Sequence, residues 1–91
     1  MKIEYDPVKR AETLRLRGID MADAVFVFED EILTVVDDRI VYGEQRFVTV
    51  GRMRGRMMFV AWTLRGDTRR TIRIRKANGR EIARYGSRFS T

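Results

Sequence analysis

Basic side chains alternate with isoleucines near the C-terminal end of the chain. If residues 70–76 form a β-strand, Ile72 and Ile74 face inward while Arg73 and Arg75 share the opposite face. An arginine guanidinium is a planar, permanently charged fork that matches a pair of phosphate oxygens. The spacing of Arg73 and Arg75 therefore predicts a surface that binds phosphate groups. The alternative is the solvated face of an outer strand.

Three residues after these arginines are candidates for a catalytic role. Lys76 has the opposite strand parity, so a twist or bulge must redirect its side chain before it can join them. Glu81 and Tyr85 could transfer protons if their surroundings shift their pKa values suitably. Each also has a structural alternative. Glu81 stands three residues after Asn78, which is the spacing of a helix capping box, and Tyr85 is placed to pack a last helix on the sheet.

Cleavage of RNA without a metal ion is compatible with this set of side chains. In that reaction the 2′-hydroxyl attacks the neighbouring phosphorus, and the site must stabilise the added negative charge and protonate the leaving oxygen. Preorganised Arg and Lys side chains provide the charge stabilisation directly. Arg46 and Arg65 are further candidates for contacts with the RNA backbone. For Arg46, an ion pair with Glu44 is the alternative.

The charges of the chain are divided by sign between its two halves. Residues 1–45 carry 6 Lys or Arg and 11 Asp or Glu, whereas residues 46–91 carry 13 and 2. The net charges are therefore −5 and +11, and twelve of the thirteen cations in the second half are arginines. This asymmetry predicts that the second half binds a polyanion, with nucleic acid as the leading candidate.

Composition excludes several classes of site. The 91 residues include no cysteine and no histidine, so disulfides, thiolate nucleophiles and the usual general base and zinc ligands are absent. We expect no metal ion and no cofactor. The longest apolar run, residues 57–62, is too short to span a bilayer, and the first residues show no apolar signal segment. These features predict a cytoplasmic protein without a membrane association.

The pattern predicts a small α+β domain over residues 1–91, with 86–91 as a frayed tail. Two N-terminal helices precede an antiparallel, twisted sheet of about four strands, and a C-terminal helix ends the domain. The predicted elements are a short edge strand at 3–5, a helix from Asp6-Pro7 to Gly18, a helix from Asp20, strands at 32–36, 45–53, 57–64 and 70–76, and a helix from Asn78 to about Tyr85. A polar turn is expected at 37–39.

Apolar spacing indicates which faces these elements bury. The first helix has an apolar stripe at Val8, Ala11 and Leu14. The strand at 57–64 is apolar on both faces, so it should lie centrally and be covered on both sides. Its tryptophan, Trp62, is expected in the core. The second helix places four side chains on one face: Met21, Ala24, Val25 and Phe28.

Several short motifs, taken in order and spacing, resemble the BrnT family of bacterial type II toxins. The resemblance extends from about Ile3 to Gly86. The motifs are Ile3-Glu4-Tyr5-Asp6-Pro7-Val8-Lys9, Tyr42-Gly43-Glu44-Gln45-Arg46-Phe47-Val48-Thr49-Val50-Gly51, Gly55-Arg56-Met57, Trp62-Thr63, and Arg75-Lys76-Ala77-Asn78 with Glu81 and Tyr85.

This resemblance implies a ribonuclease with a RelE-like fold that cuts RNA and thereby inhibits translation. It also implies an antitoxin, BrnA, whose ribbon-helix-helix domain binds DNA, in a heterotetramer with two toxins. The toxin would then be bound to DNA only through the antitoxin. The chain departs from the family pattern at two places. Leu16-Arg17 precede Gly18 where many members have Lys-His, and Arg73 stands where many have Ser.

The sequence therefore predicts a metal-independent endoribonuclease toxin. Arg75 is expected to hold phosphate or transition-state charge, with Lys76 and Arg73 assisting, and Glu81 and Tyr85 are the candidate acid–base pair. Two alternatives remain open. One is a non-catalytic nucleic-acid-binding module that uses the Arg-rich sheet face, and the other is an interaction protein whose basic face docks an acidic partner. The toxin should cleave RNA, whereas the binding module should bind RNA without cleaving it. The interaction protein should bind RNA no more tightly than a generic basic protein does.

Overall fold

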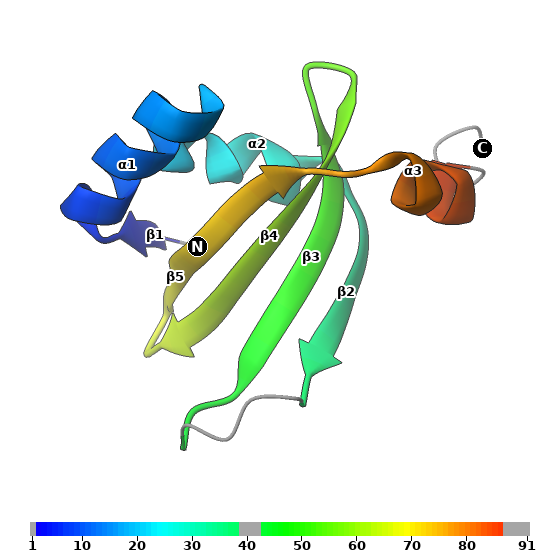
Figure 1. Ribbon diagram of the computed structural model, residues 1–91. Helices are drawn as coiled ribbons and strands as arrows, with labels where there is room; N and C mark the ends of the chain where they lie inside the picture. The colour runs from blue at the N-terminus through cyan, green and yellow to red at the C-terminus, as the bar shows by residue number, and fades with distance from the viewer. Residues whose placement is uncertain (1, 39–42, 87–91) are drawn as a thin grey trace.

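Five strands form one mixed sheet in the computed structural model, which describes residues 2–38 and 43–86. The strand order is β1-β5-β4-β3-β2, with β4 in the middle (Figure 1). In chain order the elements are β1 (Lys2–Tyr5), α1 (Pro7–Arg17), a 3₁₀ turn η1 (Met21–Asp23), α2 (Ala24–Glu29), β2 (Glu31–Asp37), β3 (Arg46–Met53), β4 (Arg56–Arg65), β5 (Thr68–Lys76) and α3 (Gly79–Tyr85).

The predicted α+β class and the four antiparallel strands are confirmed, but the sheet is mixed, because the predicted edge strand at 3–5 joins it as a fifth, parallel strand. Strands β2 to β5 pair antiparallel, and β1 adds a fifth strand that pairs parallel with β5, from Lys2 opposite Thr68 to Tyr5 opposite Thr71. A strand of four residues carries too little alternation to reveal its partner. Only the folded chain brings β1 beside a strand more than sixty residues away.

Local signals set the helix boundaries as expected. Asp6 caps α1 by accepting a hydrogen bond from the Val8 N–H at 2.9 Å, Pro7 occupies the first turn, and Gly18 ends the helix with φ 67°. Asp20 caps the next segment through the Ala22 N–H at 2.9 Å. These caps depend on near neighbours in the chain, so sequence spacing alone predicted them.

The packing faces of the N-terminal helices differ from the prediction. No residue of α1 is buried, and Val8, Ala11 and Leu14 are all exposed. The second helix begins as a 3₁₀ turn, which changes its phase. As a result Met21, Ala24 and Val27 are buried, while Val25 is 37% exposed and Phe28 is only partly buried.

The core lies between η1, α2 and one face of the sheet. Met58, Val60 and Trp62 of β4 point toward it, and Ile74 of β5 joins them. The Trp62 indole N–H donates to the Thr49 hydroxyl at 2.8 Å, so the polar atom of this buried ring is satisfied. The predicted central position of β4 and the core position of Trp62 are confirmed.

The opposite face of the sheet is not covered by helices along its length. Figure 1 shows α1 and α2 together on one side of the sheet, with α3 near the far end of β5. On this open face the β4 side chains of Phe59 and Ala61 are only partly buried. The expectation that helices cover β4 on both sides is therefore wrong for this stretch. The predicted turn at 37–39 and the predicted frayed tail lie partly outside the described residues, at 39 and 87–91.

Candidate nucleic-acid interface

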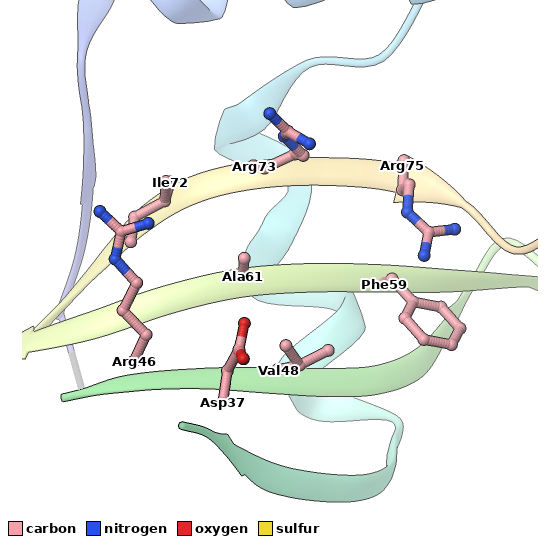
Figure 2. A pocket seen from close by; sticks show the side chains of 8 residues that line it. All are labelled: Asp37, Arg46, Val48, Phe59, Ala61, Ile72, Arg73 and Arg75. Carbon is pink, nitrogen blue, oxygen red and sulfur yellow. The ribbon is translucent and has the colours of Figure 1, made fainter. Parts of the chain in front are cut away.

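A hollow of about 390 Å³ lies on the open face of the sheet (Figure 2). Its position follows from the small side chain of Ala61 in β4, which stands between Val48 of β3 and Arg73 of β5 in the strand register. The hollow combines an apolar floor with charged walls. It is lined by Asp37, Arg46, Val48, Phe59, Ala61, Ile72, Arg73 and Arg75.

A β-bulge in β5 shapes one wall of this hollow. The pairing with β4 shifts between Ala61 and Trp62, because Ala61 lies opposite Arg73 but Trp62 lies opposite Thr71. The extra residue is Ile72. Its side chain therefore lines the hollow instead of entering the core, which corrects the predicted inward orientation. Ile74 returns to the core at 1% exposure, as predicted.

Arg73 and Arg75 share the open face as predicted, and Arg75 is held there by two contacts. Its Nη1 and Nη2 donate to Oε1 and Oε2 of Glu81, both at 2.8 Å, in a bidentate ion pair. Its guanidinium carbon lies 4.6 Å from the centroid of the Phe59 ring. Because Phe59 is the β4 partner of Arg75, the sheet itself provides the surface on which the guanidinium rests.

The ion pair changes the titration of Glu81. Hydrogen bonds from Arg75, assisted by one from the Asn78 N–H, lower the pKa of Glu81 from 4.5 to about 2. The same pair raises the pKa of Arg75. Glu81 is therefore a carboxylate under all ordinary conditions, and its oxygens are used by donors that belong to the protein.

Glu81 also takes part in the predicted capping box, which starts α3 at Asn78. The Asn78 N–H donates to Glu81 Oε1 at 2.8 Å, and the Glu81 N–H donates to Asn78 Oδ1 at 2.9 Å. Tyr85, one turn later, places its ring 6.0 Å from the Phe59 ring, centroid to centroid. The structure thus brings Arg75, Glu81 and Tyr85 together around Phe59.

Arg46 and Arg65 are neighbours at the other end of the hollow. Arg46 lines the main hollow and also an adjoining one of about 160 Å³, where Arg65 lies. Both approach Glu44, with Arg46 Nε 4.0 Å from Oε1 and Arg65 Nη2 3.9 Å from Oε2. The predicted proximity of Glu44 and Arg46 is therefore confirmed, although 4.0 Å makes it a loose ion pair. Arg65 does not line the main hollow.

Lys76 is not brought into the hollow. It lies opposite Met58 in the register, on the side of the sheet that faces the N-terminal helices. Its side chain lines a separate depression of about 250 Å³ together with Arg17, Ile19 and Arg75. The bulge in β5 falls before Lys76 and does not redirect it toward Arg73.

Sequence reasoning missed three residues that define the hollow. Phe59 and Ala61 were assigned only to a covered strand, although their spacing places both on the face opposite Trp62. Asp37 was assigned to a turn, whereas it is the last residue of β2 and lies opposite Arg46. The alternation of β4 could have identified the first two. Nothing local distinguishes Asp37 from a turn residue.

Among residues 2–38 and 43–86, no three acidic side chains are grouped so as to hold a metal ion. Within the same ranges, no helix has both the length and the apolar character needed to cross a bilayer.

The sequence of this chain matches the model of a known protein family. The match covers residues 5–81, and the family is described as the ribonuclease toxin, BrnT, of type II toxin–antitoxin systems. A comparison with curated proteins gives no match. The family match extends over most of the 91 residues and includes the last residue of β1, all of β2 to β5 and the start of α3. The chain therefore belongs to the BrnT family of ribonuclease toxins.

Proposed function

We propose that this protein is an endoribonuclease toxin that cuts RNA on the open face of its sheet and so inhibits translation. The observation that supports this most directly is the placement of Arg46, Arg73 and Arg75 around one hollow. Guanidinium groups held by a rigid sheet are suited to bind a phosphodiester and to stabilise its transition state. The family match supplies the reaction class.

The proposed reaction uses the 2′-hydroxyl of the substrate as nucleophile. Its oxygen forms a bond to the adjacent phosphorus while the bond from phosphorus to the 5′-oxygen breaks, which leaves a cyclic phosphate and a 5′-hydroxyl. One proton leaves the 2′-oxygen and one is added to the 5′-oxygen. Arg73 and Arg75 hold the non-bridging oxygens, and Arg46 and Arg65 hold the backbone on the side of the second hollow. Because the arginines carry the charge stabilisation, the proposed reaction needs no metal ion.

The geometry argues for different roles for the two candidate acid–base residues. A carboxylate with a pKa of about 2 is a weak base, and at neutral pH it carries no proton to donate. We therefore assign Glu81 to the positioning of Arg75, and Tyr85 to proton transfer. Lys76 lines a separate depression that shares Arg75 with the main hollow, so its proposed contribution is positive charge near Arg75 and not a contact inside the hollow.

An antitoxin of the BrnA type is the proposed partner. A type II toxin family implies a protein antitoxin, and the resemblance to BrnT suggests a ribbon-helix-helix protein in a heterotetramer with two toxins. We propose that the antitoxin covers the arginines of the open face and alone contacts DNA. The RelE-like fold and a location in the cytoplasm complete the proposal.

Induction of the protein in cells without an antitoxin tests this function. The wild type should arrest growth and fragment total RNA, and the purified protein should cut RNA in the presence of EDTA. Arg75→Ala should fold and cut RNA about 100-fold more slowly, the usual scale for losing a group that stabilises transition-state charge. Arg54→Gln is the control, because Arg54 lies on the hairpin between β3 and β4 and does not line the hollow. Its Nη2 is 3.7 Å from Oδ2 of Asp23.

Two results would reject parts of the proposal. Intact RNA and normal growth on induction of the wild type would reject the ribonuclease and leave a non-catalytic RNA-binding module, if the protein still binds RNA. Full activity in a folded Arg75→Ala variant would reject only the assignment of Arg75.

A further inference from the structure

We propose that Asp37 selects guanine at the nucleotide that occupies the main hollow, an inference that rests on the proposed ribonuclease function. Among the described residues that line this hollow, Asp37 is the only acid. A carboxylate repels phosphate groups, so in a site that only binds the backbone the use of Asp37 is limited to its place opposite Arg46. A carboxylate is useful there if it accepts hydrogen bonds from a base.

The register of the sheet separates the ends of the hollow. Arg46 lies opposite Thr63 of β4, and Arg75 lies opposite Phe59, four residues away on the same strand. At about 3.3 Å per residue, these two rows are about 13 Å apart along β4. Figure 2 shows Arg46 and Arg75 at opposite ends, with Asp37 and Val48 between them in the view. The hollow therefore offers a phosphate-binding group at each end, and Asp37, which lies opposite Arg46 in the register, places a carboxylate at the Arg46 end.

The floor between these ends is apolar. Ala61 lies directly between Val48 and Arg73 in the register, and its methyl group leaves the central space open. RNA-binding proteins commonly stack unpaired bases on apolar or guanidinium surfaces and read the edges of those bases by hydrogen bonds. A base that rests on Ala61 and Val48 points an edge toward the β2 side of the sheet, where Asp37 lies.

Hydrogen-bond geometry favours guanine for this position. Its Watson–Crick edge presents the N1–H and the N2 amino group side by side, and both can donate to the two oxygens of one carboxylate. Adenine and cytosine present one amino group beside a ring nitrogen that accepts and repels a carboxylate. Uracil presents a single N–H between two carbonyl oxygens. Asp37 therefore favours guanine over the other three bases.

The structural alternative is that Asp37 serves only as the cross-strand neighbour of Arg46. The two roles are compatible, because an ionised carboxylate has about four acceptor sites. They predict different results when Asp37 is changed. Loss of a neighbour of Arg46 alters affinity for every RNA equally, whereas loss of a base-reading group alters the difference between bases.

Binding of short RNAs that cannot be cut provides the test. The probes are 12-nucleotide oligouridines with a central guanosine, adenosine, cytidine or uridine, each 2′-O-methylated at every position to remove all of the nucleophiles. Their dissociation constants are measured by fluorescence anisotropy at one fixed salt concentration. The wild type should bind the guanosine probe roughly 10- to 100-fold more tightly than the others, the range expected for one bidentate base contact.

Three variants show whether this preference depends on Asp37 and the hollow. Asp37→Asn should lose the preference for guanosine while it still binds all four probes. Asp67→Asn removes the same charge from the exposed turn after β4 and should keep the preference. Ala61→Leu fills the hollow and should reduce the preference without any change of charge. Circular dichroism establishes that each variant is folded.

Each result has a definite meaning. Equal affinity for all four probes in a wild type that cuts RNA overturns the role of Asp37 and leaves the proposed function intact. A guanosine preference that persists in folded Asp37→Asn also overturns it. A wild type that neither binds nor cuts RNA rejects the proposed function itself.

Discussion

Arg75 and Glu81 are the most closely defined pair on the open face. Glu81 binds both terminal nitrogens of Arg75 and at the same time caps α3 through the Asn78 N–H. One carboxylate thus fixes the orientation of a guanidinium and the start of a helix. A phosphate that approaches Arg75 must use its remaining donors or displace Glu81.

This pair predicts a pH-dependent contribution to stability. The pKa of Glu81 is lower in the folded protein, about 2, than its ordinary value of 4.5. Its contribution is therefore complete above about pH 4.5 and is lost as the pH falls toward 2. We expect Glu81→Gln to have a lower free energy of unfolding than the wild type at pH 7, and the difference to shrink between pH 4.5 and 2. Urea unfolding followed by Trp62 fluorescence measures it.

A second substitution controls for the loss of charge. Glu12→Gln removes an exposed carboxylate from α1, far along the chain from this pair. A difference for Glu81→Gln that stays constant from pH 7 to pH 2 would contradict the ion pair as the cause.

The close approach of α2 to β3 is the tightest constraint between elements. A Cβ atom at Gly51 would lie 2.2 Å from the carbonyl oxygen of Val27 and 2.9 Å from one of its methyl carbons. Glycine is needed here because backbone meets backbone. This contact seats α2 against the sheet and keeps Val27 in the core, while the other face of the sheet stays open.

Gly51→Ala should therefore destabilise the protein by at least the 1–3 kcal/mol typical of overpacking, since the helix must move away from β3. Gly79→Ala is the matched control, because a Cβ at the start of α3 meets no atom within 4 Å. It should leave stability unchanged or raise it by up to about 1 kcal/mol. Urea midpoints of both variants measure the effect. Equal midpoints would refute the close approach.

Features that depend on residues close together in the sequence could be predicted, and features that depend on packing between elements could not. The caps at Asp6, Asp20 and Asn78 follow from contacts over two or three residues, so sequence spacing located them. The 3₁₀ turn that changes the phase of α2 and the bulge at Ile72 have no such signal. Both depend on how one element fits against another, and their effects on Val27 and on the hollow were missed.

At the scale of the whole molecule, the two oppositely charged halves of the chain meet at several ion pairs. Arg52 and Asp30 lie 2.8 Å apart, Arg70 and Glu4 3.6 Å, and Arg54 and Asp23 3.7 Å. Exposed pairs of this kind contribute little stability each. They place arginines near the helices and the edge strand beside acidic groups, as Glu81 and Glu44 do for arginines of the open face.

The arginines that line the hollow predict a salt-dependent affinity for RNA. Each arginine that contacts a phosphate of single-stranded RNA contributes about 0.7 to the slope of log affinity against log salt concentration. Arg46→Ala should therefore reduce the slope by about 0.7, whereas Arg54→Gln should leave it unchanged. Anisotropy titrations between 50 and 300 mM salt, roughly the range in which such slopes are measured, give both values. Identical slopes for wild type and Arg46→Ala would exclude a phosphate contact at Arg46.

The sequence by itself determined the order of the elements, the helix caps, the central position of β4 and the shared face of Arg73 and Arg75. Each of these follows from spacing within one segment, because backbone periodicity and capping act over a few residues. The tertiary structure alone decided that β1 pairs with β5, that Glu81 binds Arg75, and that Lys76 lies outside the hollow. It also placed Asp37 beside Arg46. These relations join side chains from different elements, and only the register of the folded sheet brings them together.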